Sequence, residues 1–211
     1  MTEIILIRHG ETDWNREQVF RGRIDVALNE VGVTQARAVQ ESLKDTVIDG
    51  IYSSPLSRAF ETASIVGKNR KGAVRVEEGF TDIDFGAWQG LSHREVKEKY
   101  NDLYETWLTQ PQLVTFPGGE SLDDVQKRSL QALEGTVKNN PGKTLALVSH
   151  RVVLKVLLCT ILGLELSHFW YLRQDTCAIN SFECKDSHYF LTLLNDTCHL
   201  RAVHGASTVD F

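Results

Sequence analysis

The segment EIILIRHG, residues 3–10, contains the features that decide both the fold and the site. Residues 4–7 of this segment are a continuous apolar run rich in β-branched residues, which is typical of a strand buried on both faces in a parallel sheet. Directly after this strand come Arg8, His9 and Gly10. In open α/β sheets the ligand binds beyond the carboxyl ends of the strands, so this segment is a candidate part of the functional site.

The rest of the chain alternates between predicted strands and predicted helices. This alternation predicts an α/β fold of three layers, α/β/α, with a mainly parallel central sheet and helices on both faces. Residues 1–211 are expected to form a single domain, because the chain lacks a linker or a repeat. Beyond His199 the tail shows no pattern. The pattern predicts strands at 3–8, 50–53, 74–77 and 144–149, helices at 29–43, 55–66, 92–108, 121–139 and 152–162, and a hairpin at 178–183 and 189–194.

Composition excludes several classes of protein. With 42% hydrophobic and 24% charged residues, the chain is neither disordered nor collagen-like. No apolar run approaches the roughly 18 residues of a membrane span, and a net charge of -5 argues against a nucleic-acid partner. The four cysteines lie far apart without metal-ligand spacing, which predicts reduced thiols in a cytoplasmic protein.

Basic side chains follow three of the predicted strands. They are Arg8, His9, Arg58, His150 and Arg151. Guanidinium groups match the oxygens of a phosphate and stay charged, so this set suits a tetrahedral oxyanion better than a metal ion. A neutral imidazole can carry a phosphoryl group if its other nitrogen is held by a hydrogen-bond acceptor. A carboxylic acid is then needed to protonate the leaving oxygen.

These residues belong to motifs that resemble the histidine phosphatase superfamily, the phosphoglycerate mutase-like group. The first motif is Arg8-His9-Gly10-Glu11-Thr12, with Asn15 downstream. The others follow in the family's order along residues 4 to 160, and five ordered blocks are far more specific than one tripeptide. They are Asp25 to Asn29 with Gly32, Ser53 to Ala63, Asp82 to Gly90, Pro117 to Ser121 and Val148 to His150.

The resemblance implies a phosphoglycerate mutase-like fold and a role for each matching residue. His9 would be the nucleophile that becomes phosphohistidine. Arg8, Arg58 and His150 would bind the phosphoryl oxygens and stabilise the transition state. Asn15 would add a donor to these oxygens, and Arg21 would be a further substrate contact. No metal and no cofactor is implied.

Two positions depart from the family pattern. Asp82 stands where most members have a glutamate, and the resemblance implies that it is the general acid and base. The shorter side chain reaches less far, and Asp84 is a rival because it lies two residues along the same extended segment. Arg151 replaces the glycine usual after the second histidine. It either adds charge at the rim of the pocket or points to solvent.

The function that these motifs imply is metal-independent hydrolysis of a small phosphate ester by a histidine acid-type phosphatase. The short chain resembles the broad-specificity and α-ribazole phosphatases, and phosphoserine and sugar bisphosphates are further candidate substrates. The main alternative is a cofactor-dependent phosphoglycerate mutase, which carries an inserted segment after the acid that this sequence lacks. Less favoured are a non-catalytic phospho-ligand binding domain and a metal-dependent hydrolase. Both a monomer and a homodimer fit the family.

Overall fold

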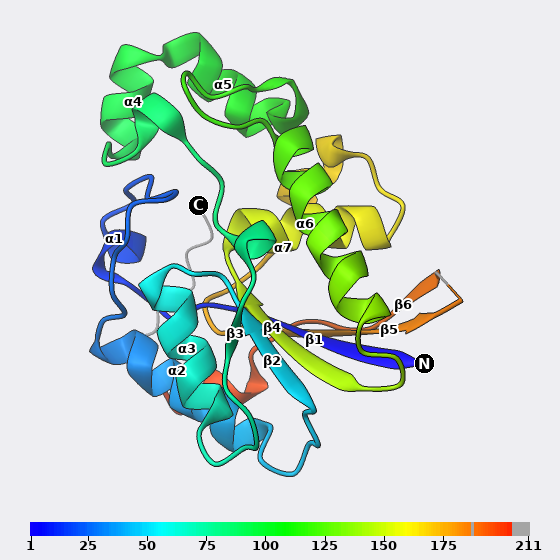
Figure 1. Ribbon diagram of the computed structural model, residues 1–211. Helices are drawn as coiled ribbons and strands as arrows, with labels where there is room; N and C mark the ends of the chain where they lie inside the picture. Colours follow the sequence, from blue (N-terminus) through cyan, green and yellow to red (C-terminus); the bar gives the residue numbers. More distant parts are fainter. Residues whose placement is uncertain (187, 204–211) are drawn as a thin grey trace.

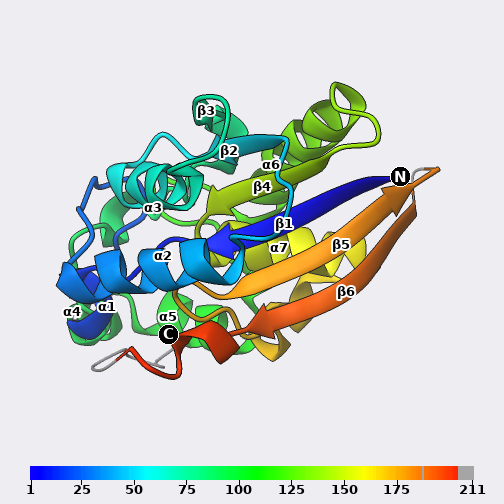
Figure 2. The ribbon, with the colours of Figure 1, turned by 90° about the horizontal axis from the view of Figure 1, so that it is seen from below.

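The computed structural model describes residues 1–186 and 188–203, and six strands in this part of the chain form one sheet (Figures 1 and 2). The strand order is β3-β2-β4-β1-β5-β6. β1 pairs in parallel with β4, and β2 pairs in parallel with β4 and β3. β5 pairs in antiparallel fashion with both of its neighbours, β1 and β6. The strands are β1 (Thr2–Arg8), β2 (Gly50–Ser53), β3 (Arg75–Val76), β4 (Thr144–Ser149), β5 (Ile179–Lys185) and β6 (His188–Asp196).

Helices cover both faces of this sheet, which confirms the predicted three-layer architecture. Figure 1 shows α2 and α3 on one face and α6 and α7 on the other. α4 and α5 form a segment beyond one end of the sheet, in which α4 lies close to the short helix α1. The helices are α1 (Asp13–Arg16), α2 (Glu30–Ser42), α3 (Ser57–Gly67), α4 (His93–Lys99), α5 (Asn101–Thr109), α6 (Leu122–Lys138) and α7 (Arg151–Ile161).

Alternating side chains of the central strands divide the core into two halves. In β1, Ile5 and Ile7 join the cluster that contains Ala36 and Ala63 of α2 and α3. The intervening side chains, such as Leu6, join the cluster on the α6 and α7 side. Because both faces are buried, a continuous apolar run rather than an alternating pattern is required in β1 and β4.

Three predicted elements differ from the structure. The helix expected at 92–108 is two helices, because Tyr100 leaves the helical region (φ -134°, ψ 41°) and redirects the chain between α4 and α5. α3 begins at Ser57 rather than at Pro55, since the carboxylate of Asp25 accepts hydrogen bonds from the backbone N–H and the hydroxyl of Ser57. The strand expected at 74–77 is only the two-residue β3. Most of the tail beyond His199, residues 204–211, lies outside the described residues.

The sheet brings the predicted site residues to one end. His9 follows β1, Arg58 lies in the first turn of α3 after β2, and His150 follows β4. β1, β2 and β4 are parallel, so their carboxyl ends meet at the same edge of the sheet. Within the described part of the chain, no helix has the length and apolar character needed to cross a membrane.

Candidate active site

His9 is buried, and its two ring nitrogens have different surroundings. The Nδ1 atom lies 2.6 Å from the carbonyl oxygen of Gly10. A carbonyl oxygen only accepts, so Nδ1 carries the hydrogen and Nε2 carries the lone pair. Burial, reinforced by the nearby charge of Arg58, lowers the pKa of His9 well below its ordinary value. The imidazole is therefore neutral at physiological pH, with Nε2 available as a nucleophile.

The loop that holds His9 is packed against two helices. The backbone N–H of Gly10 donates to the hydroxyl of Thr62 in α3, and that hydroxyl donates to the carbonyl of Arg58. On the other side, a Cβ atom at Gly10 would lie 2.5 Å from the carbonyl oxygen of Gly32. Position 10 therefore requires glycine, because any other residue would bring its Cβ atom against this carbonyl.

His150 faces His9 across the site. The two ring centroids are 5.2 Å apart. The Nε2 atom of His150 lies 2.7 Å from the hydroxyl oxygen of Ser54, and its Nδ1 atom lies 3.6 Å from a carboxylate oxygen of Asp82. Burial is also the main cause that lowers the pKa of His150 well below its ordinary value. The site thus contains two neutral imidazoles.

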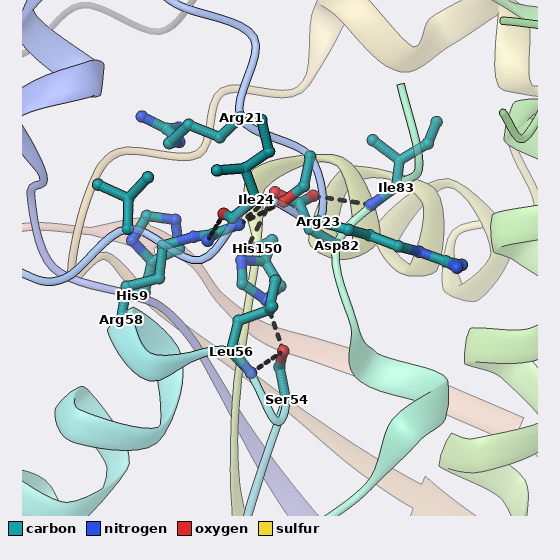
Figure 3. Close-up of polar contacts among 12 residues, drawn as sticks. His9, Arg21, Arg23, Ile24, Ser54, Leu56, Arg58, Asp82, Ile83 and His150 are labelled. Atoms are coloured by element: carbon teal, nitrogen blue, oxygen red, sulfur yellow. Dashed lines mark hydrogen bonds and ion pairs between the residues drawn. The ribbon is translucent and has the colours of Figure 1, made fainter. Parts of the chain in front are cut away.

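Arg58 connects the loop after α1 with Asp82 (Figure 3). Its Nη1 donates to the carbonyl of Ile24 over 3.0 Å, and its Nη2 donates to the carbonyl of Gly22 over 2.7 Å. The same Nη2 lies 3.0 Å from the Asp82 carboxylate. Its Nε is buried and, among the described residues, has no hydrogen-bond partner. A buried donor of this kind suits an oxygen atom of a bound anion.

Two more arginines surround the imidazoles. Arg8 is 2% exposed, and it donates to the carbonyl of Gln174. Arg21 donates to the hydroxyl of Thr12 over 3.3 Å. Burial, followed by the charges of Arg58 and Arg8, lowers the pKa of Arg21. Several cations therefore surround the two imidazoles, which makes the site strongly favourable for an anion.

The two candidate acids have different surroundings. Asp82 is 5% exposed, it pairs with Arg58, and its second carboxylate oxygen accepts from the backbone N–H of Ile83. The carboxylate of Asp84 accepts from the backbone N–H of Gly86 and lies 3.8 Å from the exposed Arg23. The structure thus brings Asp82, and not Asp84, into contact with Arg58 and His150.

The backbone around Asp82 is held by Arg128 of α6. The guanidinium donates to the carbonyls of Gly79, Thr81 and Asp82 over 2.7 to 3.1 Å. It also forms a bidentate pair with Glu120 at 2.8 and 3.0 Å, and Glu120 in turn accepts from the backbone N–H of Asp84. Planar guanidinium and carboxylate groups match each other geometrically, so this cluster fixes the loop that carries Asp82.

A pocket beside Asp82 and Arg21 is lined by side chains from four parts of the chain. Asn15 lines it, and its side-chain oxygen also accepts from the backbone and hydroxyl of Thr12. Arg151 lines it too, with its guanidinium 5.8 Å from the ring centre of Trp170, so it adds charge at the pocket instead of pointing to solvent. The other lining residues include Trp14, Arg21, Asp82, Phe85 and His93.

Several residues of the site were not predicted to be functional. Ser54 and Thr62 lie within the quoted motif of residues 53–63, and that membership is the one signal that could have identified them. Arg128 lies 46 positions from Asp82 and belongs to no motif. Among the described residues, no three His, Cys, Asp or Glu side chains form a ligand set for a metal ion.

Comparison with known proteins agrees with this geometry. Phosphoserine phosphatase 1 from Hydrogenobacter thermophilus is 36% identical over 200 residues, which cover 95% of this chain and 95% of that protein. Metal-independent phosphoserine phosphatase from Arabidopsis thaliana is 32% identical over 206 residues, covering 96% and 85%. The solved structure of Bacillus stearothermophilus YhfR has a TM-score of 0.92 at 30% identity, covering 95% and 100%. Residues 4–197 match the family itself. The chain therefore belongs to the histidine phosphatase superfamily (branch 1), which confirms the resemblance seen in its motifs.

Proposed function

We propose that the protein is a metal-independent phosphomonoester hydrolase of the histidine acid type, acting through a phosphohistidine intermediate on His9. The observation that carries this proposal is the state of His9: a neutral imidazole whose Nδ1–H is bound to the Gly10 carbonyl. Its Nε2 lone pair lies in a buried cluster of cations beside Asp82. A nucleophile, an anion-binding site and a carboxyl group thus occur together, as phosphoryl transfer requires.

The cationic cluster would bind the phosphoryl group. The buried Nε of Arg58 and the guanidinium of Arg8 supply donors, and His150 adds its imidazole. Asn15 and Arg21 line the pocket and complete the phosphate-binding set in this proposal. The dianion competes with Asp82 for Arg58 and places negative charge beside the carboxylate.

In the first step the Nε2 lone pair of His9 attacks phosphorus in line with the ester oxygen. The N–P bond forms as the P–O ester bond breaks. The ester oxygen keeps the bonding pair and takes a proton from the Asp82 carboxyl group, so the alcohol leaves neutral. The arginines stabilise the negative charge on the equatorial oxygens of the transition state.

In the second step the Asp82 carboxylate accepts a proton from a water molecule as the water oxygen attacks phosphorus. The N–P bond breaks, and its electron pair returns to Nε2 of His9. Orthophosphate is released, and Asp82 again holds the proton needed for the next turnover. One carboxyl group therefore serves as acid and then as base.

The names of the two relatives support phosphoserine as the first ester to test. Arg151 at the pocket wall suits an ester that carries a second anionic group, such as the carboxylate of phosphoserine. Sugar bisphosphates and α-ribazole phosphate remain alternatives from the sequence.

We also propose that the protein is cytoplasmic, a location that suits the buried thiols of Cys159 and Cys177. Sedimentation velocity would show whether the protein forms the homodimer that the family allows.

The test is steady-state hydrolysis of a phosphomonoester panel in the presence of EDTA, with a parallel assay for 2-/3-phosphoglycerate interchange. The panel contains p-nitrophenyl phosphate, phosphoserine, 3-phosphoglycerate and α-ribazole phosphate. We expect turnover of at least one ester, undiminished by EDTA, without interchange. Interchange with no hydrolysis would show a mutase, and loss of hydrolysis with EDTA would show that the reaction depends on a metal ion.

A further inference from the structure

The hydroxyl group of Ser54 has two hydrogen-bond partners, and its role as donor or acceptor differs between them. Ser54 is fully buried at the end of β2. The backbone N–H of Leu56 points at its oxygen over 3.3 Å, and Nε2 of His150 lies 2.7 Å from the same oxygen (Figure 3). An amide N–H can only donate, so Ser54 accepts from Leu56.

The hydroxyl hydrogen of Ser54 also needs an acceptor, because the group is buried away from water. A buried hydroxyl left without one loses a hydrogen bond that water would supply in the unfolded chain. Among the described residues, Nε2 of His150 is the acceptor within reach. The Ser54 hydroxyl then donates to Nε2, and this places the hydrogen of the neutral imidazole on Nδ1.

The other nitrogen of His150 gives an independent argument for the same tautomer. Nδ1 lies 3.6 Å from the Asp82 carboxylate, and none of the described residues accepts a hydrogen bond from it. With the hydrogen on Nδ1, an N–H dipole points at this negative oxygen, in a ring whose centre lies 5.2 Å from that of His9. With the hydrogen on Nε2, the Nδ1 lone pair would instead face the carboxylate, which is electrostatically unfavourable.

We propose that Ser54 is a positioning residue that fixes His150 in its Nδ1–H tautomer, so that His150 donates a hydrogen bond to the phosphoryl group. The tautomer follows from the contacts of Ser54 alone, whereas its catalytic consequence rests on the proposed function. In the opposite tautomer, a lone pair would meet the phosphoryl oxygens and repel them. A neutral imidazole has one donor and one acceptor nitrogen. By binding the acceptor nitrogen, Ser54 leaves the donor nitrogen of His150 for the substrate.

The first test measures the tautomer directly in the intact protein. Long-range ¹H–¹⁵N correlation spectra of histidine-labelled protein at neutral pH distinguish a protonated from an unprotonated ring nitrogen, and the His150→Asn variant identifies the signals of His150. We expect a protonated Nδ1 and an unprotonated Nε2. A protonated Nε2 in the wild-type protein would overturn the proposal, whatever the activity of the enzyme.

The second test uses amides that replace one ring nitrogen at a time. The amide nitrogen of asparagine occupies the position of Nδ1, and that of glutamine extends to the position of Nε2. We expect His150→Asn to keep a kcat for p-nitrophenyl phosphate about 10-fold or more above that of His150→Gln, the scale of one hydrogen bond to a charged group. Equal kcat values, or the reverse order, would contradict the role of the Nδ1 donor.

The third test separates Ser54 from its neighbour. Ser53 is equally buried, but its hydroxyl donates to the carbonyl of Ser54 and does not contact His150. We expect Ser54→Ala to lower kcat by about 10- to 100-fold and to change the ¹⁵N signals of His150, and Ser54→Thr to restore both. Ser53→Ala should leave those signals unchanged. Unchanged His150 signals in a folded Ser54→Ala protein would overturn the proposal.

Discussion

His9 and His150 are two buried imidazoles whose surroundings differ in one decisive respect. Burial lowers the pKa of both well below the ordinary value, so both are neutral. In His9 the carbonyl of Gly10 holds Nδ1, whereas in His150 the hydroxyl of Ser54 holds Nε2. The first arrangement leaves a lone pair in the site, and the second leaves an N–H group there.

The difference shows that a neutral histidine takes its role from the group bound to its far nitrogen. A carbonyl oxygen can only accept, so it forces the near nitrogen to be the acceptor and nucleophile. The buried hydroxyl of Ser54 has Nε2 of His150 as the acceptor within reach among the described residues, so it donates there and leaves the near nitrogen as the donor. Similar burial and charge around two rings are therefore compatible with opposite chemistry.

The largest expected effect separates the two histidines by activity. His9→Ala removes the nucleophile and should lower kcat on the order of 10⁴- to 10⁶-fold, as the loss of a nucleophile does in other enzymes. His150→Ala removes one donor and should cost about 10²- to 10³-fold. Both are measured with p-nitrophenyl phosphate, with circular dichroism as the control for folding. Equal losses would contradict the division of roles.

The next effect concerns the proton donor between the two rings. Asp82→Asn should lower kcat for phosphoserine by about 10²- to 10⁴-fold, because the alkoxide then leaves without its proton. The loss for p-nitrophenyl phosphate should be much smaller, because nitrophenolate is a stable leaving group. Asp84→Asn is the matched control and should show no such difference. If Asp84→Asn alone shows it, the assignment of the acid is wrong.

A smaller effect is expected when the support of Asp82 is removed. Arg128→Met deletes the donors to the carbonyls of residues 79, 81 and 82, so Asp82 should shift and kcat for phosphoserine should fall by about 10-fold or more. Arg94→Met, at an exposed site on α4, is the matched control for the loss of an arginine. A uniform loss on p-nitrophenyl phosphate and phosphoserine would indicate a general structural defect instead.

The smallest expected effect is on the pH dependence of the free energy of unfolding. Both imidazoles have lowered pKa values in the folded protein and titrate near 6.5 in the unfolded chain. Their contribution is complete above about pH 6.5 and is lost as the pH falls, because only the unfolded chain then binds the protons. Each histidine therefore adds up to about 1.4 kcal/mol per pH unit to the slope of the free energy of unfolding against pH.

Urea denaturation between pH 5 and pH 7 measures this slope for the wild-type protein and for His150→Asn. The variant lacks one of the two imidazoles, so its free energy of unfolding should depend less steeply on pH below 6.5. Identical slopes would mean that His150 is charged or exposed in the folded protein, which would contradict the comparison between the two rings.

Much of the fold could be predicted because its elements carry local signals. The continuous apolar runs of β1 and β4 indicate strands buried on both faces. The side chains of Ser121 and Asp124 form the capping box that marks the start of α6. The break at Tyr100 could not be predicted, since this residue is no helix breaker and the change of direction depends on packing between α4 and α5.

The candidate site divides in the same way. His9, Arg58 and His150 could be singled out because each follows a predicted strand of a parallel sheet. The partners that define their chemistry could not be read from spacing. Ser54 lies 96 positions from His150, and only the folded chain shows which way its hydroxyl points.

In the proposed mechanism His9 accepts the phosphoryl group on Nε2, whereas His150 only binds it. Rapid alkaline quenching of the enzyme during turnover of ³²P-labelled substrate, followed by peptide mapping and separation of the two phosphohistidine isomers, tests this directly. We expect an Nε2-linked phosphohistidine in the peptide that contains His9, and none in the His9→Ala variant. A phosphoryl group on Nδ1 of His9, or on His150, would contradict it.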